Sequence, residues 1–69
     1  MKHWKTLEVK FDDLVEIAEI FIDEDDRLYV RQTYSYFDGY THTDRLAPMT
    51  ENTLKFYEKY GKENEQNRI

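Results

Sequence analysis

The sequence of 69 residues contains no cysteine, one proline and two glycines. Without cysteine, the chain can form neither disulfides nor thiolate zinc sites, which stabilise many very small domains. No stretch approaches the roughly 18 consecutive apolar residues of a membrane span, and the charged N-terminus, MKHWKTLEVKF, lacks the apolar core of a signal peptide. We therefore expect one small cytoplasmic domain that begins at its own Met1, with a self-associating surface, such as a homodimer contact, as a further source of stability.

Residues typical of catalytic, phosphate-binding and metal sites are also scarce. The only serine, Ser35, lies within a predicted strand, and there is no glycine-rich phosphate loop. The acidic segment after Phe21 fails as a calcium-binding loop, because Arg27, Leu28 and Tyr34 stand where that motif needs an oxygen ligand, glycine and glutamate. We predict that the protein is not an enzyme and that it needs no cofactor or metal.

The charged side chains of residues 12–26 are all negative. The eight carboxylates, with no lysine or arginine among them, are Asp12, Asp13, Glu16, Glu19, Asp23, Glu24, Asp25 and Asp26. The net charge of the chain is −5, and residues 1–26 hold nine acidic and three basic side chains, against six and seven in residues 27–69. An acidic field disfavours binding to membranes and to phosphate backbones, and it favours a partner protein with a basic surface.

Three segments are predicted strands. Residues 4–11 alternate between apolar and charged side chains, and Asp12 and Asp13 can turn the chain. Residues 14–22 are ambiguous: a capping box with Glu16 and apolar helical spacing would suit a helix, whereas four β-branched residues suit a strand. We favour the strand, because the segment leads through DEDD into residues 27–37, the clearest strand pattern. Alternation places Leu28, Val30, Tyr34 and Tyr36 on one face of that strand and Tyr29, Arg31, Thr33, Ser35 and Phe37 on the other.

The dipeptide Asp38-Gly39 between aromatic residues predicts a β-hairpin with a two-residue type I′ turn. That turn pairs Phe37 with Tyr40, Ser35 with His42 and Thr33 with Asp44. Residues 40–44 then form a short return strand.

The C-terminal third predicts a helix. Residues 46–49, LAPM, are expected to leave the sheet, and Thr50 is a suitable N-cap for a helix over residues 51–60. Gly61 suits the left-handed position after the helix. Residues 1–62 then form the domain, and residues 63–69 form a polar, frayed tail.

Strands followed by one helix predict an α+β domain: a small antiparallel meander of three or four strands with one C-terminal helix packed on one face. A helix of ten residues spans only about 15 Å, which is too short to cover the whole sheet. The uncovered face is expected to carry aromatic residues and to mark an interface.

The aromatic residues Tyr34, Tyr36, Phe37 and Tyr40, with His42, have three interpretations. They can pair across the hairpin, they can contact a protein partner, or they can stack on bases beside Arg31 and Arg45. Trp4 is expected to anchor the core or a dimer contact. His3, His42 and Asp44 are too few to indicate a metal site.

The acidic run has an ordinary interpretation as a solvated strand face and turn. Alternatively, a strand places alternate carboxylates about 6.6 Å apart on one face, comparable to the spacing of phosphates along one DNA strand, so that the run could occupy a groove built for nucleic acid. In general character, though in no specific motif, the short, acidic, tyrosine-rich chain resembles small inhibitors encoded by phages, including anti-CRISPRs and anti-restriction factors.

We therefore expect a DNA-mimicking inhibitor of a nucleic-acid-processing enzyme, acting in the host cytoplasm through the eight carboxylates and Tyr34, Tyr36, Phe37 and Tyr40. Direct nucleic-acid binding by the aromatic hairpin and a dimeric assembly subunit are the alternatives.

Overall fold

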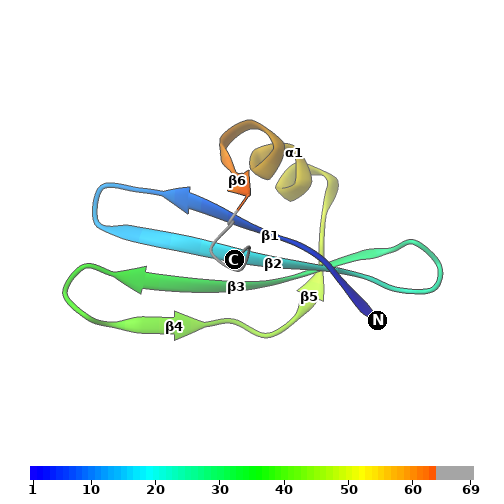
Figure 1. Cartoon of the computed structure of the whole chain (residues 1–69), viewed down its shortest axis with the longest axis horizontal. Helices are drawn as coiled ribbons and strands as arrows, with labels where there is room; N and C mark the ends of the chain where they lie inside the picture. The colour runs from blue at the N-terminus through cyan, green and yellow to red at the C-terminus, as the bar shows by residue number, and fades with distance from the viewer. Residues whose placement is uncertain (64–69) are drawn as a thin grey trace, which may run out of the picture.

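The computed structural model describes residues 1–63. Its elements are β1 (Lys2–Lys10), β2 (Leu14–Ile22), β3 (Leu28–Tyr36), β4 (Thr41–Thr43), β5 (Ala47–Pro48), α1 (Glu51–Tyr60) and β6 (Lys62–Glu63). Within these residues the strands form one antiparallel sheet in the order β4-β3-β2-β1-β6, with β5 also paired to β3 (Figure 1). The predicted α+β class and meander order are confirmed, but the sheet has six strands instead of three or four. No helix in the described part is long and apolar enough to cross a membrane.

The ambiguous segment is a strand throughout. Every residue of β2 pairs with β3, from Leu14 opposite Tyr36 to Ile22 opposite Leu28. The β-branched side chains therefore outweighed the capping signal, because in a strand paired on both sides they pack against neighbours in β1 and β3.

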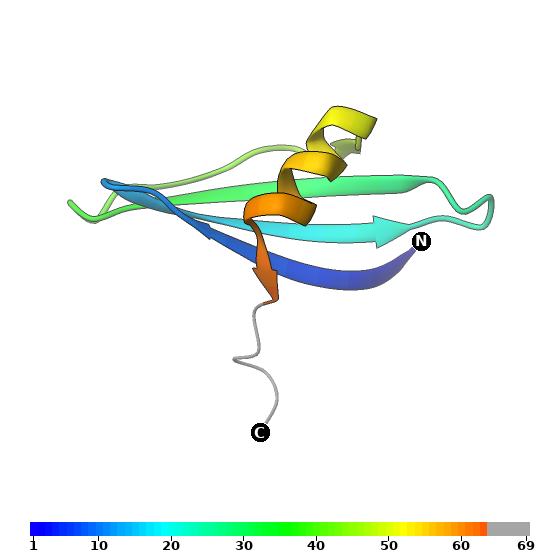
Figure 2. The same ribbon diagram turned by 90° about the horizontal axis from the view of Figure 1, so that it is seen from above.

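Helix α1 lies on one face of the sheet and crosses its strands (Figure 2). It has the predicted bounds, and Thr50 caps it by accepting a hydrogen bond from the Thr53 backbone N–H at 3.2 Å. Tyr57, only 1% exposed, is the residue through which the helix enters the core. The core comprises Leu7, Val9, Ala18, Ile20, Val30 and Tyr57.

The β3–β4 hairpin differs from the predicted one by one residue. The Tyr36 N–H donates to the Tyr40 carbonyl at 2.8 Å, so the loop has three residues, and of these only Gly39 has a positive φ, at 101°. A type I′ turn needs positive φ at Asp38 as well, and Asp38 instead accepts a hydrogen bond from the Tyr40 N–H at 3.0 Å. The predicted pairs are therefore wrong: Tyr34 lies opposite His42, Ser35 opposite Thr41 and Thr33 opposite Thr43.

The segment after the hairpin also differs from expectation. Residues 46–49 do not leave the sheet, because Ala47 and Pro48 form β5 beside the part of β3 that β4 does not reach. Gly61 has an ordinary φ of −81° and not a left-handed one. Glycine is needed there for space, since a Cβ atom would lie 2.6 Å from the Tyr57 carbonyl oxygen.

The tail prediction fails at its first residue, since Glu63 belongs to β6 and pairs with Leu7. The rest of the predicted tail, residues 64–69, lies outside the described residues.

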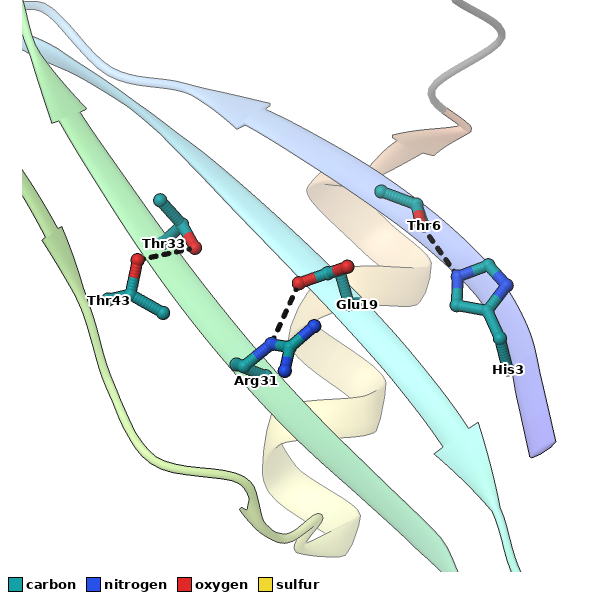
Figure 3. A network of polar contacts seen from close by, with 6 residues as sticks. All are labelled: His3, Thr6, Glu19, Arg31, Thr33 and Thr43. Carbon is teal, nitrogen blue, oxygen red and sulfur yellow. Dashed lines mark hydrogen bonds and ion pairs between the residues drawn. The ribbon is translucent and has the colours of Figure 1, made fainter. Parts of the chain in front are cut away.

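The face of the sheet opposite α1 carries no other element of residues 1–63, as predicted. Figure 3 looks onto this face, with the helix behind the sheet. Arg31 donates to Glu19 at 2.9 Å, and Thr33 and Thr43 are joined at 3.1 Å. The Arg31 guanidinium also lies 5.6 Å from the Phe21 ring centroid. This face is thus mixed: polar pairs occupy its middle, and the rings of His3, Phe21 and Tyr29 lie opposite one another towards one end, so the aromatic residues expected on it are present in part.

Candidate partner-binding surfaces

The eight carboxylates of the acidic run do not form the row that was predicted. Asp12 and Asp13 lie in the β1–β2 turn and Asp23 to Asp26 in the β2–β3 turn, at opposite ends of β2 and about 30 Å apart at strand spacing. Between them, Glu16 and Glu19 are three residues apart and therefore point to opposite faces of the sheet. Charge gathers at the two ends of the sheet instead of along one strand.

Glu16 points into the core beneath α1 and is 5% exposed. Its carboxylate accepts a short hydrogen bond from the Tyr57 hydroxyl and a second one, of 3.0 Å, from the Gln32 side-chain amide. Gln32 also donates to the Tyr57 hydroxyl oxygen at 2.6 Å. Both partners of the buried carboxylate are neutral, so Glu16 helps to fix the helix to the sheet and is not available to bind a partner directly.

Burial, followed by the hydrogen bond to Glu16, raises the pKa of Tyr57 well above its usual value of 10. A raised pKa in the folded state adds stability that is complete below pH 10 and is lost as the pH rises towards the folded value. We expect the urea midpoint, followed by circular dichroism, to fall above pH 10. In the Tyr57→Phe variant the fall should be smaller, and an equal fall in both proteins would contradict the assignment.

Glu19 is neutralised within the molecule. It forms an ion pair with Arg31 on the open face, and this contact raises the pKa of Arg31. The two charges therefore compensate each other, and Arg31 lies on the face opposite to Tyr34 and Tyr36, whereas the base-stacking alternative placed it beside those rings.

The acidic tip, residues 23–26, keeps its charge exposed. Asp23 organises the turn by accepting hydrogen bonds from the backbone N–H groups of Asp25 at 2.8 Å and Arg27 at 2.9 Å. The Arg27 N–H is the main reason that the pKa of Asp23 is lowered. Asp26 has a left-handed φ of 64°, and Glu24, Asp25 and Asp26 are exposed. Within residues 1–63, none of the four takes part in an ion pair.

The aromatic hairpin lies at the other end of the sheet. The Tyr36 and Tyr40 rings contact each other at 5.7 Å between centroids. Phe37 and Tyr40 are 68% and 59% exposed, and the Phe37 N–H donates to the Asp13 carbonyl at 3.2 Å. That bond joins the β3–β4 hairpin to the acidic β1–β2 turn, so that exposed rings and carboxylates share one end of the molecule.

A groove with a volume of about 410 Å³ opens at this end, on the face that carries α1. Its lining residues are Phe11, Asp13, Leu14, Glu16, Tyr34, Tyr36, His42 and Asp44. We call it the acidic–aromatic groove. Four of the predicted site residues line this groove: Asp13, Glu16, Tyr34 and Tyr36. The other four lining residues, Phe11, Leu14, His42 and Asp44, were not predicted as site residues, because their proximity depends on how β2 and β4 pair with β3.

Other candidate residues lie apart from this groove. Trp4 is 48% exposed at an irregularity in the pairing of β1, so of its two predicted roles it does not anchor the core, and the dimer contact stays a prediction. His3 bonds to Thr6 on the open face, far from the pair formed by His42 and Asp44 at 2.7 Å. Among residues 1–63, no three acidic or histidine side chains are grouped to hold a metal ion.

Comparison with known proteins gives no match: no family model, no curated protein and no solved structure is significantly similar to this chain.

Proposed function

We propose that this protein is a non-catalytic inhibitor that binds the basic, nucleic-acid-binding surface of an enzyme. The observation that supports the proposal most directly is the acidic tip. Consecutive exposed carboxylates stand at the end of a hairpin with nine-residue strands, in a turn that is already held by Asp23. A turn ordered before binding loses little conformational entropy on binding, so the tip can enter a groove that normally accepts phosphates.

The mechanism is steric competition. The acidic tip accelerates association with a basic groove through long-range attraction. Exposed rings such as Phe37 and Tyr40 at the other end of the sheet supply apolar contact area, which slows dissociation. The two ends are about 30 Å apart at strand spacing, so a partner that contacts both has an extended surface.

Affinity capture from source cells, followed by mass spectrometry, tests the proposal. We expect a nucleic-acid-processing enzyme to be recovered, to be displaced by duplex DNA or heparin, and to lose nucleic-acid binding when the inhibitor saturates it. An enzyme that still binds its nucleic acid normally at saturation would contradict steric competition.

Titration of labelled single-stranded oligonucleotides tests the nucleic-acid-binding alternative. We expect no binding even at low salt, because bases stacked on Tyr34 or Tyr36 would bring phosphates close to the carboxylates of the acidic–aromatic groove. Micromolar binding that weakens as salt rises would favour direct nucleic-acid recognition. A stable dimer in light scattering, with no enzyme recovered, would favour an assembly subunit.

A further inference from the structure

The acidic–aromatic groove combines two features that suit one kind of ligand. Rings of Phe11, Tyr34 and Tyr36 line it, and the Tyr34 and His42 rings are parallel within 14° at 6.5 Å between centroids. Carboxylates of Asp13 and Asp44 stand in the same lining. Planar cations bind to aromatic faces and to carboxylates at once, because both present negative potential.

The negative charge of the groove is not balanced by positive side chains in its lining. No lysine or arginine is among its lining residues, and its one basic group, His42, is paired with Asp44. At its floor, the buried Glu16 is bonded only to the neutral Tyr57 and Gln32. Burial and then the charges of Glu16 and Asp44 raise the pKa of Tyr34, as expected where the potential is negative.

We infer that the acidic–aromatic groove receives an arginine side chain of the protein partner. Arginine fits better than lysine, because the guanidinium is planar, stacks on rings and donates to carboxylates in a fork. The inference rests on the proposed function only in that the partner is a basic protein. It adds a defined contact at the end of the sheet opposite the acidic tip.

The test uses the isolated protein, labelled with ¹⁵N, and the blocked peptide acetyl-Gly-Gly-Arg-Gly-Gly-amide. We expect saturable shifts of backbone amides at residues 11–14, 34–36 and 42–44, with millimolar affinity, as is typical of one side chain at an open site. The same peptide with citrulline in place of arginine is nearly identical in shape and uncharged, and it should bind at least about tenfold more weakly.

Two matched variants locate the contact. Asp13→Asn should weaken peptide binding by about threefold to tenfold, whereas Asp25→Asn, which removes the same charge at the far end of the sheet, should leave binding within about twofold. Tyr36→Leu, which keeps an apolar side chain but removes the ring, should weaken binding similarly to Asp13→Asn. Each variant alters an exposed side chain, and its amide spectrum verifies that it is folded.

Equal binding of the arginine and citrulline peptides would overturn the inference, as would shifts centred on residues 23–26 or no saturable shift at all. Because this titration needs no enzyme, its failure would leave the steric-competition proposal standing. Conversely, if no nucleic-acid-processing enzyme were recovered, the proposed function would fail, but specific binding of the arginine peptide would still support the arginine site.

Discussion

Replacing Tyr57 by alanine is expected to lower the free energy of unfolding by about 3–5 kcal/mol. The ring is the largest fully buried side chain of the core and the main link between α1 and the sheet. A domain of 69 residues has a total stability of only about 3.5–10 kcal/mol. The variant should therefore be largely unfolded in modest urea, which circular dichroism with urea titration measures.

Two further variants separate the ring from its hydroxyl. Tyr57→Phe keeps the ring but leaves Glu16 with Gln32 alone, at a cost of about 1–3 kcal/mol. Combining Tyr57→Phe with Glu16→Leu removes the buried charge together with its donor, and we expect the double variant to be more stable than the sum of the two single effects. Simple additivity would show that the Glu16–Tyr57 contact contributes no coupling energy.

Reversing charge at the acidic tip is expected to produce the second large effect. The double variant Glu24→Lys, Asp25→Lys should associate with the captured enzyme at least about tenfold more slowly at low salt, and the difference should shrink as salt rises. Asp23 and Asp26 are left unchanged, because Asp23 holds the turn and Asp26 has a left-handed backbone that lysine adopts less readily. Stopped-flow or surface-plasmon measurements give the association rate.

The matched control is Glu58→Lys with Glu63→Lys. Both residues are exposed on α1 and β6, and the double change raises net charge by the same amount as the change at the acidic tip. A much smaller effect of the control would assign the attraction to the tip. Equal slowing by the two variants would mean that net charge alone acts, and unchanged association in both would contradict electrostatic docking.

Local signals explain what was predictable about the fold. The helix over residues 51–60 followed from the Thr50 cap and its apolar stripe, and the strand over residues 14–22 followed from its β-branched side chains. By contrast, β5 and β6 have two residues each, too few for any periodicity. They form because neighbouring strands leave hydrogen-bonding edges free, and that depends on the assembled sheet.

The candidate site was predicted less well than the fold, partly because an available signal was overlooked and partly because some contacts depend on the assembled structure. The opposite orientation of Glu16 and Glu19 was already implied by their odd spacing once residues 14–22 were assigned to a strand. The contact between Glu16 and Tyr57 was not, since it joins residues 41 apart through docking of the helix. The one-residue error at the Asp38-Gly39 turn moved His42 from the pair with Ser35 to the pair with Tyr34, and so hid the groove.

The outer edge of strand β1 affects how readily the protein aggregates at high concentration. On its outer side β6 pairs only with Leu7 and Glu8, so within the described residues the backbone from Lys2 to Thr6 forms an open edge. Strands of other molecules can pair with an open edge, and repeated pairing of this kind leads to fibrils. Here the pairing of β1 with β2 is irregular between His3 and Lys5, and two lysines lie along the edge. Irregular geometry and positive charge are the devices by which natural sheets resist such growth.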